Sequence, residues 1–220
     1  MPRMARVVVP HYPHHVTQRG SRRQAVFLQD ADWSAYLALI RACCARTDTR
    51  VLAYCLMPNH VHFVMVPSHE DGLRAAIAGA HRRHARRVNA REGWRGHLWQ
   101  ERFHSFVMNE PHLHAAIPYV ENNPVRAGLC AFPADWSWSS AKEAERPPHA
   151  GLVDWSLRER LVGTWSPLDP GASARSEEIL RLHTRTGRPL GSDEFVEQIE
   201  AATGRVLRPK RRGRKPGPTT

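Results

Sequence analysis

Several features that define whole classes of protein are scarce in this sequence. It holds four cysteines in 220 residues and no C-x-x-C pair, which argues against a zinc knuckle and against a disulfide scaffold. No apolar run approaches the roughly 20 residues that a membrane-spanning helix needs. Prolines and histidines interrupt the short apolar run at residues 7–9, so the start of the chain does not resemble a secretory signal. We expect a cytoplasmic protein with no membrane partner, whose cysteines pack in the interior: Cys43, Cys44, Cys55 and Cys130.

Acidic residues are also scarce relative to basic ones. The chain has 32 lysines and arginines, nearly all of them arginine, against 21 aspartates and glutamates, which gives a net charge of +11. Arginine is the residue best suited to bidentate contacts with phosphate. Residues 204–220 hold seven basic side chains and no acidic one. We expect a polyanionic partner, with counterion release contributing to its affinity; the alternative is that the basic tail only solubilises the protein.

The hydrophobic pattern predicts alternating strands and helices over the first two thirds of the chain. Apolar runs of strand length, helical stripes at i, i+3, i+4 and i+7, and turn signals between them set the order. A capping box at Ser68 and Asp71 and a cap at Asn109 mark two helix starts. The expected elements are strand 14–20, a helix from 30, strands 51–57 and 60–66, a helix from 72, strand 98–108 and helix 110–122.

This order predicts an α+β fold, in which helices pack on a mostly antiparallel sheet. We expect residues 1–145 to form that domain. Residues 146–203 would be a small helical extension, with helices near 156–161, 176–183 and 192–202 and a C-cap at Gly204. Residues 204–220 are too polar and too rich in proline and glycine to bury anything, so we expect a disordered basic tail.

Two histidines lie two positions apart at the start of the strand 60–66. Side chains at i and i+2 of a strand project from one face, with their Cα atoms about 7 Å apart. His60 and His62 can therefore converge on one metal ion. Taken alone, the pair is more simply read as ordinary histidines at a strand end, since the chain has 14 of them.

The helix at 110–122 carries a tyrosine with an asparagine four positions later. Residues i and i+4 share a helix face, so the Tyr119 phenol and the Asn123 amide can reach one small site. Pro124 disfavours helical geometry at Asn123, so the helix can end there, and Asn122 or Glu121 are alternative ligands. The alternative for Tyr119 is a ring that only packs in the core.

In these motifs the sequence resembles the single-tyrosine HUH transposases, and among them the REP-associated tyrosine transposases, which are linked to repetitive extragenic palindromes. The combination of MPNHVH with a distant YVENNPVRAG is specific, whereas H-x-H or a lone tyrosine would not be. The likeness follows the family's order through most of residues 12–140, at segments 14–20 (HHVTQRG), 57–62 (MPNHVH), 99–103 (WQERF), 119–128 (YVENNPVRAG) and 138–140 (WSS).

The resemblance implies a ferredoxin-like fold and a bacterial, nucleoid-associated enzyme that acts on single-stranded DNA with hairpin structure. Tyr119 would be the nucleophile, and His60, His62 and Asn123 would hold Mg²⁺ or Mn²⁺. The protein would be a monomer or a homodimer. Its long C-terminal part favours the palindrome-associated type over insertion-sequence transposases that move their own gene. The candidate DNA-binding residues are Arg19, Arg22, Arg23, Arg82, Arg83, Arg86, Arg126, Arg211, Arg212 and Arg214.

Two other functions fit the same residues. A metal-dependent nuclease that uses water would leave Tyr119 with a structural role. A non-catalytic DNA-binding regulator would depend on the basic tail and the last helices. An exposed arginine face, such as that of residues 82–86, is also consistent with simple solvation.

Overall fold

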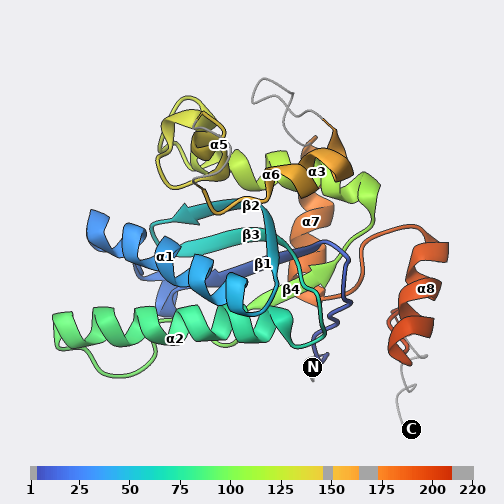
Figure 1. Ribbon diagram of the computed structural model, residues 1–220, viewed down its shortest axis with the longest axis horizontal. Helices are drawn as coiled ribbons and strands as arrows, with labels where there is room; N and C mark the ends of the chain where they lie inside the picture. Colours follow the sequence, from blue (N-terminus) through green and yellow to red (C-terminus); the bar gives the residue numbers. More distant parts are fainter. Residues whose placement is uncertain (1–3, 146–150, 164–172, 210–220) are drawn as a thin grey trace, which may run out of the picture.

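A four-stranded antiparallel sheet forms the centre of the protein. The computed structural model describes residues 4–145, 151–163 and 173–209, and its strands lie in the order β2-β3-β1-β4 (Figure 1). With the helices α1 and α2 inserted between strands, the chain runs β1-α1-β2-β3-α2-β4, which is the ferredoxin-like order. The predicted α+β fold is confirmed. The strands are β1 (His14–Arg19), β2 (Arg50–Met57), β3 (His60–Val66) and β4 (His104–Val107).

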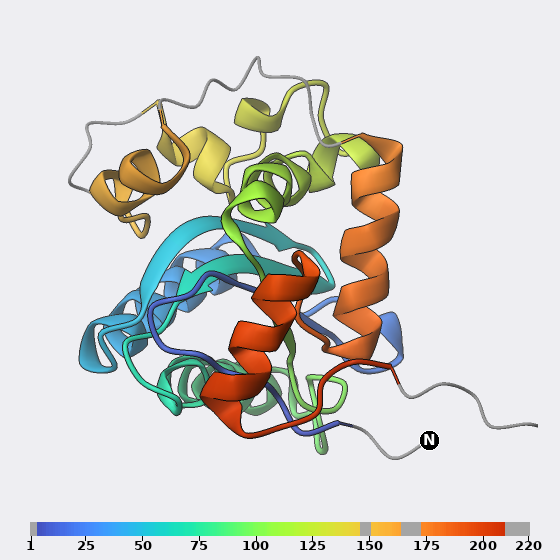
Figure 2. The same ribbon diagram turned by 90° about the vertical axis from the view of Figure 1, so that its right-hand side faces the viewer.

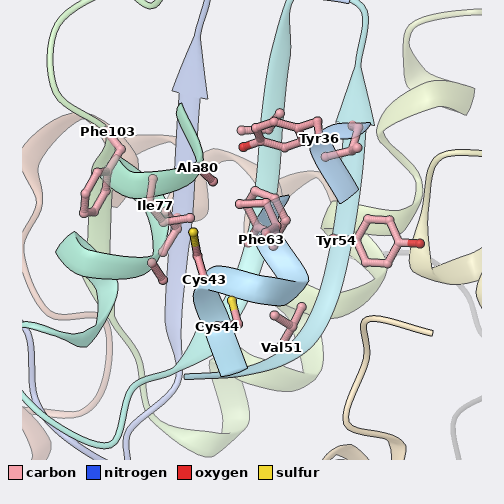
Figure 3. Packing of buried hydrophobic residues seen from close by; sticks show 14 of the residues in the cluster. Tyr36, Cys43, Cys44, Val51, Tyr54, Phe63, Ile77, Ala80 and Phe103 are labelled. Carbon is pink, nitrogen blue, oxygen red and sulfur yellow. The ribbon is translucent and has the colours of Figure 1, made fainter. Parts of the chain in front are cut away.

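One face of the sheet is covered by α1 (Asp30–Arg46) and α2 (Gly72–Glu92), which pack side by side (Figure 1). Alternate residues of β3, such as Phe63, point into this first core, as the two-residue period of a strand requires. Figure 3 shows Phe63 among Cys43 of α1 and Ile77 and Ala80 of α2. The buried residues of α1 recur at helical spacing, as the sequence pattern predicted, and pack into this core.

The opposite face of the sheet is covered by α3 (Glu110–Glu121), α6 (Trp155–Val162) and α7 (Ala174–Thr186). α3 lies across β2 and β3, and α7 stands beside it and contacts β1 and β4 (Figure 2). Leu180 of α7 is buried in the same cluster as Val64 of β3 and Phe106 of β4. Helices from beyond residue 145 therefore complete the second core. The short elements are Ser21–Arg23, α4 (Asn123–Arg126), Pro133–Asp135 and α5 (Ser140–Glu143).

Two local expectations are wrong. Asp71 precedes α2 but makes no side-chain cap, and the Ser68 hydroxyl donates instead to the carbonyl of Thr47, so no capping box forms. The last strand is much shorter than residues 98–108, because Glu101 adopts a positive φ of 59° that interrupts the extended chain. Trp99, before that break, forms only an isolated bridge with Gly20.

Residues 205–208, near the end of the described chain, pack against the rest of the protein. α8 (Asp193–Thr203) ends at Gly204 in left-handed geometry, as expected. Beyond it, Leu207 is only 1% exposed and packs with Val7 and Ile199, while Arg205 donates to the carbonyls of Ala5 and Arg6. The expectation that nothing is buried from Arg205 onward is therefore wrong for residues 205–208, because the Leu207 side chain packs against the N-terminal segment. Residues 210–220 lie outside the described part.

The expectation that the cysteines pack in the interior holds for three of the four and is wrong for Cys130, which is partly exposed. All four cysteines are free thiols, and Cys43, Cys44 and Cys55 are buried. Among the described residues, no helix is long and apolar enough to cross a membrane.

A buried ion pair joins the C-terminal extension to the second core. Arg158 of α6 (2% exposed) donates to Glu121 of α3 (0% exposed) at 2.8 Å and also to the carbonyl of Leu52 in β2. Ser140 donates to the same carboxylate at 2.6 Å. The carboxylate is thus satisfied only while α6 is docked.

We predict that Arg158→Ala lowers the free energy of unfolding by about 3–5 kcal/mol, because it leaves a buried carboxylate without its charge partner. Urea denaturation measures this loss. Arg160→Ala, which removes an exposed arginine from the same helix, is the control and should change stability by less than about 0.5 kcal/mol. Equal effects of the two substitutions would contradict the role assigned to the pair.

Candidate functional site

A cavity of about 550 Å³ opens on the second face of the sheet, beside α3 and α7. His60 and His62 of β3 line it together, because the strand period places both on the face opposite Phe63. Across the sheet, Thr17 of β1 pairs with His62, and Arg19 pairs with His60. We call this the histidine cavity. Its lining residues are Thr17, Gln18, Arg19, His60, His62, Gln100, Glu101, His104, Tyr119, Asn123, Arg181, Thr184 and Arg185.

Tyr119 lies over the two histidine strands. It comes from α3, is 5% exposed, and its ring centroid is 5.9 Å from the His62 ring and 5.9 Å from the His15 ring of β1. Arg126 lies over the phenol ring at 4.4 Å and donates to the Tyr119 carbonyl at 2.7 Å. Glu177 of α7 holds the other end of the same guanidinium at 2.9 Å. The phenol is therefore held between the histidines and a cation.

Asn123 also faces the histidine cavity, although α3 ends before it. α3 stops at Glu121, one residue earlier than expected, and Asn123 is itself helical as the first residue of α4, so the expectation that Pro124 keeps it out of a helix is wrong. The Asn123 side-chain nitrogen donates to the carbonyls of Tyr119 and Val120, at 3.1 and 3.2 Å. Both partners are acceptors, so the amide nitrogen must face them and Oδ1 is left available. Of the alternatives, Asn122 donates to Pro118 and Glu121 is engaged by Arg158, and neither lines the cavity.

The ring orientation of His60 is fixed by a neighbour. Its Nδ1 lies 2.6 Å from Oδ1 of Asn59, whose amide nitrogen donates to the carbonyl of Arg23. Oδ1 of Asn59 is thus an acceptor, so His60 Nδ1 carries the proton and Nε2 carries a lone pair. Burial, assisted by the charge of Arg19, lowers the pKa of His60 to about 4. The ring is therefore neutral at neutral pH.

The donor set fits a divalent cation of intermediate hardness. Burial, followed by the charges of His60 and His15, holds the pKa of His62 well below its usual value, so this ring is neutral too. Two neutral imidazoles and an amide oxygen are mixed nitrogen and oxygen donors, which suit Mn²⁺ somewhat better than Mg²⁺. The described residues hold no group of three or more histidine, cysteine, aspartate or glutamate side chains suited to a metal. The Asn123 amide is the candidate third donor, because it lines the same cavity as the two histidines.

Sequence reasoning missed several residues of the site. His15 is buried on the same face as His62, and its position in the strand 14–20 could have indicated this. His104 of β4 completes the row across the sheet opposite Thr17. The sequence predicted a helix near 176–183, but nothing in the pattern indicated that it reaches the site; α7 brings Arg181, Thr184 and Arg185 to the cavity from more than 50 residues after Tyr119.

The candidate DNA-binding arginines occupy different places. Arg19 lines the histidine cavity and Arg126 lies on the Tyr119 ring. Two further hollows adjoin, and Glu101 lines all three. Arg22 and Arg23 line one of them, and Arg82 and Arg86 of α2 line the other, whereas Arg83 lines none of the three. Arg211, Arg212 and Arg214 lie outside the described residues.

Comparison with known proteins points to one family. The model of the family described as IS200-like transposases matches residues 8–123, more than half of the chain. A Haemophilus influenzae protein assigned as a REP-associated tyrosine transposase is 23% identical over 148 residues, which span 59% of this chain and 84% of that protein. A solved REP-associated tyrosine transposase bound to a REP hairpin superposes with a TM-score of 0.55 at 18% identity, covering 65% of this chain and 84% of the other. The resemblance inferred from the sequence motifs is confirmed, and the solved structure has the same fold.

The buried histidines predict a loss of stability in acid. Burial lowers the pKa of His15 to about 3, whereas an unfolded histidine titrates near 6.5. As the pH falls below about 6.5, the unfolded chain takes up protons that the folded chain does not, so the free energy of unfolding decreases. In urea denaturation between pH 6 and 4.5, His15→Gln should reduce this slope by about 1.4 kcal/mol per pH unit.

The control for this experiment is His97→Gln, because His97 is exposed. It should leave the slope unchanged. If His15→Gln and the native chain respond identically to acid, His15 is not held neutral in the folded state.

Proposed function

The chain belongs to the family of IS200-like transposases, and on that premise we propose that it cleaves and rejoins single-stranded DNA at hairpin-forming, repetitive extragenic palindromic elements. Tyr119 is the proposed nucleophile, and a divalent metal is the proposed cofactor. One observation carries this proposal. The phenol of Tyr119, the imidazoles of His60 and His62 and the amide of Asn123 come from distant parts of the sequence and line one cavity.

The proposed reaction exchanges one phosphoester for another. The Tyr119 oxygen attacks the phosphorus of a DNA phosphodiester, and the bond from phosphorus to the 3′-oxygen breaks. The phenol gives up its proton and the departing 3′-oxygen gains one, so a 5′-phosphotyrosine and a free 3′-hydroxyl result. Because the new bond is also a phosphodiester, its energy is retained and rejoining needs no ATP.

A free phenol has a pKa near 10, so the site must assist the attack. His60, His62 and Asn123 would hold the divalent metal, through Nε2 of each imidazole and Oδ1 of the amide. A metal held there would supply Lewis-acid chemistry, polarising the phosphate and stabilising the charge on the departing oxygen. Arg126 holds the phenol ring from its other side and places a positive charge beside it.

The remaining charges of the histidine cavity suit a phosphate backbone. Arg19 enters from β1, and Arg181 and Arg185 enter from α7, so the cavity has basic side chains on two sides. Guanidinium groups bind phosphate oxygens in pairs and neutralise the strand as it passes Tyr119. We assign these three arginines to the scissile strand.

The adjoining hollows suit the rest of the DNA. Arg22 and Arg23 lie beside the cavity, and Arg82 and Arg86 of α2 lie further along. The solved relative is bound to a REP hairpin. We propose that single-stranded nucleotides next to a hairpin follow Arg22 and Arg23, and that the backbone of the stem contacts α2. Because Tyr119 and the proposed metal donors meet within one chain, we propose that a single copy carries out the reaction.

The experiment that tests this function is a covalent-adduct assay. The protein is incubated with Mn²⁺ and a labelled single-stranded hairpin substrate and then analysed under denaturing conditions. We expect a denaturant-resistant protein–DNA adduct that is lost with chelator and lost in Tyr119→Phe. The Tyr119 hydroxyl makes no hydrogen bond within the described residues, so this substitution should leave folding intact. Tyr12→Phe, which changes a tyrosine outside the cavity, is the matched control.

The outcomes separate the alternative functions. Cleavage that survives Tyr119→Phe would identify a nuclease that uses water. Tight duplex binding that ignores chelator and His60→Ala, with no cleavage, would identify a non-catalytic regulator. Either result overturns the proposal.

The basic tail generates a separate prediction. Deleting residues 210–220 removes Lys210, Arg211, Arg212, Arg214 and Lys215 but keeps Leu207, which packs in the fold. DNA affinity should fall, and the slope of log affinity against log salt should flatten by up to about 0.7 for each phosphate that the tail no longer neutralises. Fluorescence anisotropy over a salt series measures both. Cleavage at saturating DNA should be retained, and its loss would contradict a role limited to binding.

A further inference from the structure

Thr184 of α7 is hydrogen-bonded on two sides. Its hydroxyl oxygen lies 2.8 Å from the carbonyl of Leu180, one turn earlier in the helix, and 3.3 Å from Nδ1 of His15 in β1. A hydroxyl has one proton, and a carbonyl has none to donate. The Thr184 proton must therefore go to Leu180, as is common for threonine inside a helix. If it pointed to His15 instead, two oxygens would face each other at 2.8 Å with no proton between them.

The direction of this bond determines the protonation of His15. Because the Thr184 oxygen can only accept from the ring, His15 Nδ1 must carry a proton. A neutral imidazole has a single N–H, so Nε2 of His15 carries a lone pair. That Nε2 lies 3.0 Å from Nδ1 of His62. The proton in this second bond must therefore belong to His62 Nδ1.

From this relay we propose that Thr184 and His15 are positioning residues that fix the tautomer of His62 and leave its Nε2 as the metal donor. The inference rests on the proposed function in so far as it assigns a metal to His62. The chain of bonds runs from His62 Nδ1–H to His15, from His15 Nδ1–H to Thr184 and from Thr184 to Leu180. Each step has one possible direction.

The other two proposed metal donors, His60 and Asn123, are also oriented by hydrogen bonds to neighbouring groups. His60 is fixed through Asn59, and the Asn123 amide is fixed by the carbonyls of α3. All three groups thus present a lone pair to the histidine cavity before any metal arrives. Partners that orient a metal-binding histidine typically change metal affinity by about 10–100-fold when removed.

The relay assigns a specific role to the C-terminal extension. Thr184 lies 61 residues beyond the end of the family match at residue 123, on a helix that the match does not include. α7 nevertheless contacts β1 and β4 and lines the cavity. The extension is thereby part of the metal site and not merely a cover for the sheet.

The test uses the full chain and Thr184→Val, which keeps the shape of the side chain and removes the hydroxyl. Imidazole ¹⁵N chemical shifts of the metal-free protein report which nitrogen of His62 is protonated. We expect Nδ1–H in the native chain and a mixture of tautomers in the variant. Mn²⁺ affinity, measured by calorimetry without DNA, should fall at least about tenfold.

Controls separate the relay from a general structural effect. Thr184→Ser restores the hydroxyl and should restore both readouts. His15→Gln should retain part of the native His62 tautomer and Mn²⁺ affinity, because the glutamine amide oxygen can accept from His62. His15→Phe offers no acceptor and should lose both. Thr186→Val removes a hydroxyl from the same helix outside the cavity and should change neither readout.

The results distinguish the two proposals. A native His62 protonated at Nε2, or a Thr184→Val protein with unchanged tautomer and Mn²⁺ affinity, overturns the relay. A native chain that does not bind Mn²⁺ contradicts the proposed function. In that case the tautomer measurement on the metal-free protein still decides whether Thr184 controls His62.

Discussion

The alternation of side chains along β3 is the constraint on which the rest of the structure depends. Odd-numbered residues such as Phe63 anchor the strand in the core beneath α1 and α2, while His60 and His62 face the other way. A slip of one residue would exchange the two sets. The position of both imidazoles is therefore set by the core beneath α1 and α2, and the helices on the far face determine which residues contact them.

His60 and His62 of the cavity are neutral, and nearby arginines help to keep them so. A protonated imidazole in the histidine cavity would be buried near the charges of Arg19 and Arg126, and both charges oppose its ionisation. The rings therefore keep their lone pairs available, which a metal ligand requires. Positive charge at the site comes instead from guanidinium groups, which remain ionised and match the charge of a nucleic-acid backbone.

The sequence predicted what depends on local pattern and missed what depends on distant contacts. Strand alternation placed His60 and His62 on one face, because it follows from backbone geometry. Asn123 lies near Tyr119 although α3 ends between them, because its amide nitrogen donates to the carbonyls of Tyr119 and Val120. Thr184 had no such signal, since its role exists only when α7 docks against β1. The capping box at Ser68 failed for a related reason, because a tertiary partner, the Thr47 carbonyl, bonds the serine hydroxyl.

Glu177 and Thr184 lie seven residues apart on α7, which is about two turns, and so share one side of the helix. Glu177 binds the Arg126 guanidinium that lies over the Tyr119 ring. Thr184 accepts a hydrogen bond from His15, which in turn contacts His62. One helix, α7, thus contacts the residues that position both the proposed nucleophile and a proposed metal donor. Any shift of α7 would disturb the proposed nucleophile and the proposed metal donor together, so both depend on one docked helix.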